Sequence, residues 1–578
     1  MKKPKVSLII PVYKGANYMK EAIDSALDQT YDNLEIIVVN DGSPDGGATE
    51  RIAKSYGNKI RYFAKENGGV STALNMAIKN MKGEYFTWLS HDDLYLPNKV
   101  EEQIDYLIKH DLVGTKTILY ADYALINEHS YLLSEQHKNH YLLNEYVELS
   151  LLSGAINGLT LMIPKRAFDE CGLFDESLRC VQDYKLWFDF LKAGYNFIHQ
   201  NKVFTATRLH LQQTTNVSPV MVSEGEDFWK EVLDYYESKV SNKIYGSKYM
   251  YYNEMHNFFR YTPYNGLTKY TQDVLDKFEK KNEKNKELVS VIISYKDNLD
   301  NVIKSAKSVL NQNYKNIEII LVDNNSKEKS KKLDETIKKN KIIYIQRKDS
   351  NKILGLNEAI KKSTGEYIAF LEPGNEFSEE KINVQLQKLK TSEIGFSHTS
   401  YDYENNGKKD YINSGTQSGL IRYNVISENR INFSTVMVKS DYIKNNNIYF
   451  DDTREYGGYD CFYLDLLSKT NALGIDLPLV IVHDDAVNYT YSNDYQIRKS
   501  EEILTYVLSD KTLCDKQNNI KALINYINTL YNSQDGINYN RDFDYTKYRP
   551  KIKNWRNWRI LKPVKRVRNK IRRTLARK

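Results

Sequence analysis

The sequence predicts an α/β fold made of two copies of one domain, each built on a mainly parallel sheet. One observation is an internal repeat, because residues 29–40 match residues 312–323 and residues 83–89 match residues 365–371. The matches keep one order along the chain, at offsets of 283 and 282 positions. The other observation is that short β-branched runs alternate with helical patterns inside each copy, as in parallel sheets covered by helices.

The first copy begins with the apolar run Val6–Ile10, which has the length and composition of a buried strand. A helical pattern over 19–29 follows, and then a second apolar run over 35–39. A helical pattern over 71–80 precedes a third run at 85–89. Ligands of such sheets bind beyond the carboxyl ends of the strands, so the polar residues directly after each strand are the site candidates.

Composition and pattern divide the 578 residues into five parts. We expect a first α/β domain at 1–225, a helical linker at 226–286, a second domain at 287–495, a helical region at 496–545 and a basic tail at 546–578. The linker is rich in Tyr and Lys and ends in a polar run.

The basic charge of the chain is concentrated in the tail. The whole sequence has 82 Lys and Arg against 75 Asp and Glu, a net charge of +7. Residues 547–578 carry 15 of the basic residues and no acid, which leaves a net charge of −8 on residues 1–546. Apolar residues recur in the tail at spacings of three or four from Trp558 onward, which predicts a basic amphipathic helix on an anionic membrane surface. Nucleic-acid binding and a solvated tail are the alternatives, and we expect no nucleic-acid partner.

The composition also excludes several classes of protein. Hydrophobic residues make up 41% and charged residues 27%, which excludes a disordered or collagenous chain. The four cysteines contain no CxxC pair and indicate a reducing compartment rather than a disulfide framework. No apolar run reaches the length of a membrane span or of a signal-peptide core. We therefore expect a cytoplasmic protein, held peripherally at the inner face of the cell membrane.

Acidic residues follow two of the predicted strands. Asp41 stands in the segment Asn-Asp-Gly-Ser after 35–39, and Asp92 and Asp93 follow the strand at 85–89. Carboxylates at neighbouring strand ends can converge on a hard cation, Mg²⁺ or Mn²⁺, that bridges a diphosphate. The structural alternative is that these segments form turns and helix caps. The presence of both segments after strands favours a functional site.

Five motifs occur in a characteristic order: Pro11-Val-Tyr, Asn40-Asp-Gly-Ser, Asn67-Gly-Gly, Gly83-Glu-Tyr and Ser90-His-Asp-Asp. This ordered set resembles glycosyltransferase family 2, whose domains have the GT-A fold. The resemblance covers roughly residues 5–215, with a weaker match over roughly 288–490. It implies two GT-A domains with a helical linker and C-terminal helices, and a nucleotide-diphosphate sugar, expected to be a UDP-sugar, as the donor.

The resemblance also implies roles for individual residues. Asp41 would contact the nucleoside, Asp92 the ribose or the metal, and Asp93 the metal, which would be Mn²⁺ or Mg²⁺. The expected nucleotide-sugar-binding residues are Pro11, Tyr13, Asp41, Asn67, Asp92 and Arg208. The expected metal ligands are Asp92, Asp93 and His210. Where many relatives place a further Asp, this sequence has Ser90, which leaves two carboxylates.

Asp183 is the candidate catalytic base, because Val181-Gln-Asp-Tyr resembles the family's Glu-Asp motif with Gln182 in place of the Glu. In the family this Asp deprotonates the acceptor hydroxyl, and the sugar is transferred by one in-line displacement with inversion. A positioned general base is typically worth 10²–10⁴-fold. The structural alternative is an Asp that caps the helix after it.

Several further residues carry weaker expectations. Arg208 and His210 resemble the family's Arg-x-His segment, in which the Arg meets a phosphate and the His reaches the metal or diphosphate; a structural His is the alternative. Asn157 is expected to line the acceptor site. His129, His137 and His140 are interpreted as surface residues without a convincing partner set.

The second copy is expected to be catalytically reduced. Alignment of the copies places Gly374 and Asn375 opposite Asp92 and Asp93, and His483 opposite His210. Gly cannot bind a metal, and Asn is a poorer ligand for a hard cation. Asp323 and Asp460 remain as second-domain site candidates. The alternative is a bifunctional transferase with both domains active.

We therefore expect a metal-dependent, inverting, hexosyltransferase-type enzyme of surface polysaccharide or glycoconjugate synthesis, acting on a glycan or lipid-linked acceptor. The family's processive members carry a Gln-x-x-Arg-Trp motif, and its absence from this sequence favours addition of one or a few sugars over channel-linked polymerisation. A non-catalytic sugar-nucleotide or glycan-binding component of an assembly with other transferases is the alternative. A glycoside hydrolase with paired carboxylates is disfavoured by acidic motifs placed at strand ends.

Overall fold

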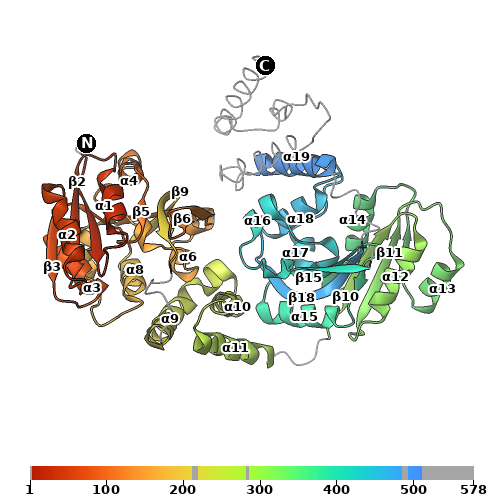
Figure 1. Cartoon of the computed structure of the whole chain (residues 1–578). Coiled ribbons are helices and arrows are strands. Elements are labelled where there is room, and N and C mark those ends of the chain that lie inside the picture. The colour runs from red at the N-terminus through yellow and green to blue at the C-terminus, as the bar shows by residue number, and fades with distance from the viewer. Residues whose placement is uncertain are drawn as a thin grey trace, which may run out of the picture. The chain divides into compact units, whose positions relative to one another are not determined.

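The computed structural model describes residues 3–138, 140–210, 219–280, 286–405, 407–483 and 493–510 (Figure 1). This part of the chain divides into two compact units, each containing one α/β domain. The first unit comprises the residues up to Val240 together with Met255–Thr271. The second comprises Ser241–Glu254 and the described residues from Gln272 onward.

The first domain is built on a sheet in the order β3-β2-β1-β4-β8, parallel except for β8. The strands are β1 (Val6–Val12), β2 (Leu34–Asp41), β3 (Arg61–Lys65), β4 (Tyr85–Trp88) and β8 (Ile163–Pro164). All seven residues of β1 are buried, because the strand lies inside the sheet with β2 on one side and β4 on the other. Its β-branched composition is typical of a parallel strand covered on both faces.

Helices cover the two faces of this sheet. On one face Met19 and Ile23 of α1 (Met19–Leu27) pack in one cluster with Leu8 and Ile10 of β1. Trp88 points to the opposite face and lies against the Phe174 ring, which contacts α8. The other helices of the domain are α2 (Ala48–Ser55), α3 (Val70–Asn80), α4 (Lys99–Lys109), α5 (His140–Glu145), α6 (Glu148–Leu152), α7 (Arg166–Cys171) and α8 (Gln182–Lys192).

A second, four-stranded sheet brings a distant segment to the end of β4. Its order is β5-β9-β6-β7. The strands are β5 (Leu94–Tyr95), β9 (Asn196–Arg208), β6 (Thr117–Ile126) and β7 (Leu132–Gln136). Leu94 pairs with Ala206, so Asp92 and Asp93 lie beside the end of β9.

The second domain repeats the strand order of the first. Its sheet runs β12-β11-β10-β13-β17-β15-β18-β14, with β16 paired to β15. The strands are β10 (Val289–Tyr295), β11 (Ile317–Asp323), β12 (Ile343–Gln346), β13 (Tyr367–Phe370), β14 (Glu376–Phe377), β15 (Phe396–Asn405), β16 (Lys408–Ile412), β17 (Met437–Lys439) and β18 (Ala472–His483). Ile292 pairs with Ile320 and Phe370 as Ile9 pairs with Ile37 and Trp88. The predicted duplication of an α/β domain is confirmed.

The helices of the second domain occur in the same order along the chain. They are α12 (Leu299–Leu310), α13 (Lys331–Lys339), α14 (Lys352–Lys362), α15 (Lys381–Ser392), α16 (Arg422–Glu428), α17 (Ser440–Lys444) and α18 (Gly458–Leu466). A further helix, α19 (Asn493–Ser509), follows the sheet.

Three helices follow the first domain: α9 (Pro219–Val240), α10 (Lys248–Phe259) and α11 (Asn265–Lys280). Helix α9 runs through position 226, where the linker was expected to begin, and it belongs to the first unit. The basic tail at 546–578 and most of the expected helical region at 496–545 lie outside the described residues. Within the described ranges no helix is both long enough and apolar enough to cross a membrane.

Candidate active site

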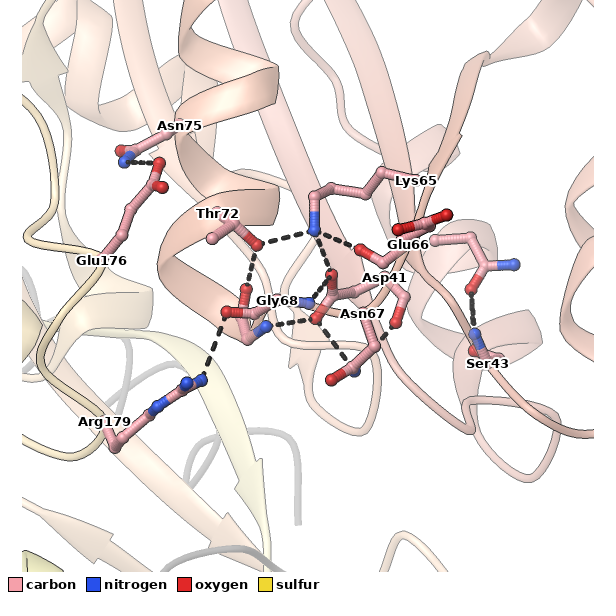
Figure 2. Close-up of polar contacts among 12 residues, drawn as sticks. Asp41, Ser43, Lys65, Glu66, Asn67, Gly68, Thr72, Asn75, Glu176 and Arg179 are labelled. Carbon is pink, nitrogen blue, oxygen red and sulfur yellow. Dashed lines mark hydrogen bonds and ion pairs between the residues drawn. The ribbon is translucent and has the colours of Figure 1, made fainter.

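The Asp41 carboxylate organises the loop that precedes α3 (Figure 2). Asp41 ends β2 and is buried. Its Oδ1 accepts hydrogen bonds from Lys65 Nζ at 2.6 Å and from the Gly68 backbone N–H at 3.0 Å. Its Oδ2 accepts from the Gly69 N–H at 2.8 Å and from Asn67 Nδ2 at 3.2 Å. The expected residues Asp41 and Asn67 therefore contact each other, and the contact of Asp41 with the nucleoside stays a prediction.

Two glycines make this loop possible. Gly42 has a φ of +64°, and a Cβ at this position would lie 2.5 Å from the Asn67 backbone nitrogen. Gly69 has a φ of +93° and stands directly before α3. Only glycine adopts such angles readily, and at Gly42 only glycine leaves room for the loop.

The predicted metal residues come together at the end of β4. Asp93 is buried, and its Oδ1 accepts from the Arg208 backbone N–H at 2.7 Å. Asp92 Oδ2 lies 3.0 Å from His210 Nε2. Burial and the neighbouring charge of Asp92 raise the pKa of Asp93.

The donor set fits a hard divalent cation. The two carboxylates suit Mn²⁺ or Mg²⁺, whose usual ligands are oxygens, and a buried carboxylate beside a second one gains from a cation. In the ranges that the structure describes, no group of three or more His, Cys, Asp or Glu side chains has metal-site geometry. Since Asp92 and His210 bond to each other here, metal binding would redirect both side chains.

The Arg208 guanidinium forms an ion pair and hydrogen bonds with other groups of the protein. The side chain is fully buried and lies 4.4 Å from the Tyr18 ring centroid. Its Nη2 pairs with Glu21 Oε2 at 2.9 Å, its Nη1 donates to Ser130 Oγ at 2.8 Å, and its Nε donates to the Asp92 carbonyl at 2.7 Å. Arg208 thereby fixes the backbone of the metal motif, and its predicted phosphate contact stays a prediction.

Asp183 lies in the first turn of α8 and does not cap it. The N-cap residue is Val181, which makes no side-chain capping bond. The Asp183 Oδ1 accepts from the Tyr184 backbone N–H at 2.8 Å. Burial raises the pKa of Asp183 to about 6, although backbone N–H groups oppose the shift. A carboxylate with this pKa is suited to accept a proton near neutral pH.

The loop before α8 is tied to α3 (Figure 2). Asn75 Nδ2 donates to the Phe174 carbonyl and to Glu176 Oε1, both at 2.8 Å. Arg179 Nη1 donates to the Gly68 carbonyl at 3.3 Å. The loop that carries the candidate base is thus joined to the loop that Asp41 organises.

Sequence reasoning missed Glu224. Its carboxylate, on α9, accepts the backbone N–H groups of Arg179 at 3.0 Å and Cys180 at 2.8 Å, just before α8 begins. Charge-assisted bonds of this kind are the stronger ones. No local motif marks Glu224, because its partners lie more than 40 residues away along the chain.

Three other expected residues have different surroundings. Pro11 is buried in β1, and Tyr13 is exposed just after the strand. Asn157 caps a short helical turn, with its Oδ1 accepting from the Leu159 N–H at 3.0 Å. Asn432 makes the same cap in the second domain. Capping explains Asn157 without a ligand, and acceptor binding by Asn157 stays a prediction.

The interpretation of His137 and His140 as residues without partners is wrong. His137 Nδ1 lies 3.0 Å from Asp122 Oδ2, and His199 Nε2 lies 2.9 Å from Asp122 Oδ1. His140 Nδ1 lies 3.2 Å from His199 Nδ1. Asp122 and His199 are buried, and no local motif indicates that these side chains meet across β6, β9 and the segment after β7.

The second domain departs from the first at the Asp41 position. Strand register pairs Val12 with Asn40 and Tyr295 with Asp323, so Asp323 stands where the first domain has Asn40. The counterpart of Asp41 is Asn324. Asn324 is buried, and its Nδ2 donates to Ser294 Oγ and the Tyr295 carbonyl.

The expected alignment of His483 with His210 is also wrong. Asn375 Oδ1 accepts the His483 backbone N–H at 3.1 Å, as Asp93 accepts that of Arg208. His483 is therefore the counterpart of Arg208. Its Nε2 lies 3.0 Å from Glu376 Oε1, which also pairs with Lys304 at 3.0 Å.

Asp460, the counterpart of Asp183, has an internal counter-ion. Its Oδ1 accepts from Asn429 Nδ2 at 2.6 Å and lies 3.1 Å from Lys499 Nζ. Beside it, the rings of Tyr459 and Phe433 stack 4.1 Å apart. These aromatic residues stand where the first domain has Gln182 and Gly158.

Comparison with known proteins agrees with the duplicated fold. The family model described as glycosyl transferase family 2 matches residues 7–162 and 290–451, one region in each domain. A protein named as an uncharacterized glycosyltransferase of Rickettsia bellii (strain RML369-C) is 38% identical over 517 residues, covering 88% of this chain and 74% of that relative. The chondroitin synthase of Pasteurella multocida (strain Pm70) is 28% identical over 322 residues, covering 55% of this chain and 32% of the synthase.

Among solved structures, the chain is similar to S. aureus TarS 1–349, with a TM-score of 0.35, 14% identity, and coverage of 46% of this chain and 78% of that one. The two family matches fall on the two sheets that share one strand order. The chain belongs to glycosyltransferase family 2 and carries the family's domain twice.

Proposed function

We propose that the first domain transfers a sugar from a nucleotide-diphosphate sugar, expected to be a UDP-sugar, to a hydroxyl of a glycan or lipid-linked acceptor, with inversion. The observation that carries this proposal is the state of Asp183, a partly buried carboxylate in the first turn of α8 whose pKa is raised by burial to about 6. No lysine or arginine pairs with it among the described residues. It belongs to the same domain as Asp92, Asp93 and His210.

The chemistry assigned to Asp183 is proton transfer. As the acceptor oxygen bonds to the anomeric carbon, its proton passes to the Asp183 carboxylate, and the bond from that carbon to the diphosphate oxygen breaks. The leaving nucleotide diphosphate keeps the electron pair. A bound Mn²⁺ or Mg²⁺, held by Asp92, Asp93 and His210, would supply positive charge for the leaving group.

The relatives support a role in polysaccharide or glycoconjugate synthesis. One relative is named for the synthesis of chondroitin, and the chain covers 32% of that protein, so only the general reaction class is carried over. Attachment to an anionic membrane through the tail at 546–578, on the cytoplasmic side, stays a prediction, as does assembly with other transferases.

The second domain is proposed to be catalytically reduced and to serve structure, acceptor binding or assembly. Asn375 replaces Asp93, and Asn324 replaces Asp41. The bifunctional alternative would require Asp460 to act as a base while it is paired with Lys499.

A panel of nucleotide sugars tests the proposal. Release of the nucleotide diphosphate is measured for the full chain with a glycan acceptor, in Mn²⁺, in Mg²⁺ and after chelation. We expect release from one donor, dependent on the cation and lost in Asp93→Ala and Asp183→Asn. Activity that survives both substitutions would contradict the assignment to the first domain.

A further inference from the structure

Helices α9 and α19 hold the base-bearing helix of their own domain in the same way. In the first domain, Glu224 of α9 accepts the N–H groups of Arg179 and Cys180. In the second, Glu502 of α19 accepts those of Tyr456 at 2.9 Å and Gly457 at 2.6 Å. Each pair of donors lies three and four residues before the aspartate that is the candidate base. The two glutamates are therefore structural equivalents.

This equivalence aligns the sequence of α9 with that of α19. Three residues before Glu502 stands Lys499, and three residues before Glu224 stands Met221. Residues three apart on a helix lie on one face, so each faces the same loop as its glutamate. The second domain thus has the ammonium of Lys499 at this position, and the first has the thioether of Met221.

Lys499 provides Asp460 with a counter-ion. Lys499 Nζ lies 3.1 Å from Asp460 Oδ1, and the Asp460 side chain is only 4% exposed. Asn429 Nδ2 donates to the same oxygen at 2.6 Å. The Asp460 carboxylate is therefore already engaged by an ion pair and a hydrogen bond within the protein.

Asp183 has no such partner. Among the described residues no lysine, arginine or histidine forms an ion pair with it, and its hydrogen bonds come from backbone N–H groups of its own helix start. The nearby Lys185 pairs with Asp189 at 2.7 Å instead. The basicity of Asp183 is therefore not reduced by an internal cation.

We propose that the residue three positions before the glutamate that holds the helix start decides which domain has a working base. Lys499 pairs with Asp460 and prevents it from accepting a proton, whereas Met221 leaves Asp183 able to accept the proton of the acceptor. Glu224 and Glu502 are positioning residues that hold the two helix starts alike. The inference rests on the proposed transferase function of the first domain and adds the determinant that separates the two domains.

The first experiment moves the lysine into the first domain. Met221→Lys in the full chain is compared with Val220→Lys, which adds the same charge at an exposed neighbouring position. We expect Met221→Lys to lower kcat by at least about 100-fold, with the donor KM within about twofold and the acid limb of the pH–rate profile moved to lower pH. Val220→Lys is expected to keep the wild-type kcat. A folded Met221→Lys protein with unchanged kcat and an unchanged acid limb would overturn the proposal.

The second experiment removes the lysine from the second domain and does not use activity. Without Lys499, the buried Asp460 carboxylate loses its counter-ion, and a buried charge without a partner costs folding free energy. That cost is present where the carboxylate is ionised and is relieved where it is protonated, so the stability of Lys499→Met should fall as pH rises. We expect its Tm, relative to wild type, to be lower at pH 8 than at pH 5, and Lys499→Met/Asp460→Asn to abolish this dependence. A Tm difference independent of pH would overturn the pairing.

The two experiments separate this inference from the proposed function. If wild type transfers sugar and Asp183→Asn does not, but Met221→Lys does, the function stands and the inference fails. If Asp183→Asn transfers sugar as wild type does, the proposed function fails. The thermal test still decides whether Lys499 is the counter-ion of Asp460 in the second domain.

Discussion

The two domains share a scaffold and differ in the partners of acidic residues at equivalent positions. In the first, Asp93 is buried beside Asp92, and Asp183 has no cation beside it in the described part of the chain. In the second, Asp460 pairs with Lys499, and Glu376 pairs with Lys304. Glu372, at the position of Ser90, pairs with Lys352 at 3.0 Å.

The difference teaches which features the fold requires. The strand order, the capping asparagines Asn157 and Asn432 and the glutamates Glu224 and Glu502 occur in both domains, so they serve the scaffold. The first domain keeps Asp93 where the second has Asn375, and Asp183 has no ion pair among the described residues where Asp460 has Lys499. Buried charge without a partner costs folding free energy, so its retention there indicates use.

The largest effect is expected from exchanging the metal-motif residues. Asp93→Asn should reduce transfer at least about 100-fold, because the group that stabilises charge on the leaving diphosphate is lost. The same change should raise the Tm of the metal-free protein, since burial and Asp92 raise the pKa of Asp93. Asn375→Asp should bring no second activity. The rates and Tm values of both variants check this, and a metal-free Asp93→Asn protein less stable than wild type would count against the account.

The pH dependence should be set by Asp183. A general base works deprotonated, and burial raises the pKa of Asp183 to about 6. The transfer rate is therefore expected to rise with pH and to level off above that value, falling about tenfold per pH unit well below it. Rates measured at saturating donor between pH 4.5 and 8 check the sign. A rate that falls between pH 5 and 7 would point to a general acid instead.

A smaller effect is expected at the positioning glutamates. Glu224→Gln removes the charge from two backbone contacts and should lower kcat about tenfold through displacement of α8, with a loss of about 1–3 kcal/mol in the free energy of unfolding. Glu502→Gln should cost similar stability and leave the rate unchanged. Equal effects of the two substitutions on the rate would remove the distinction between the domains.

Local pattern predicted most of the fold, because strands buried in a parallel sheet are apolar runs and their helices are periodic. The polar residues after the strands indicated Asp41, Asp92 and Asp93, and the resemblance to the family added Asn67 and His210, which lie against Asp41 and Asp92. The sequence motifs locate these site residues because each motif lies directly after a strand, where ligands of such sheets bind.

What the sequence could not predict depends on long-range contacts. Glu224 and Lys499 act on loops about 40 residues earlier and carry no local signal. The identification of His483 with Arg208 required strand register, because a shift of two residues changes which side chain stands at the site. The contact of the exposed His137 with the buried Asp122 is likewise a tertiary effect.

The central claim is that one domain reacts and the other does not. The most direct test measures initial rates of nucleotide release for the full chain carrying Asp183→Asn or Asp460→Asn, at the same donor, acceptor and Mn²⁺ concentrations. The account predicts that Asp183→Asn loses about 10²–10⁴-fold in kcat while Asp460→Asn stays within about twofold of wild type. A large loss in Asp460→Asn with full activity in Asp183→Asn would contradict it.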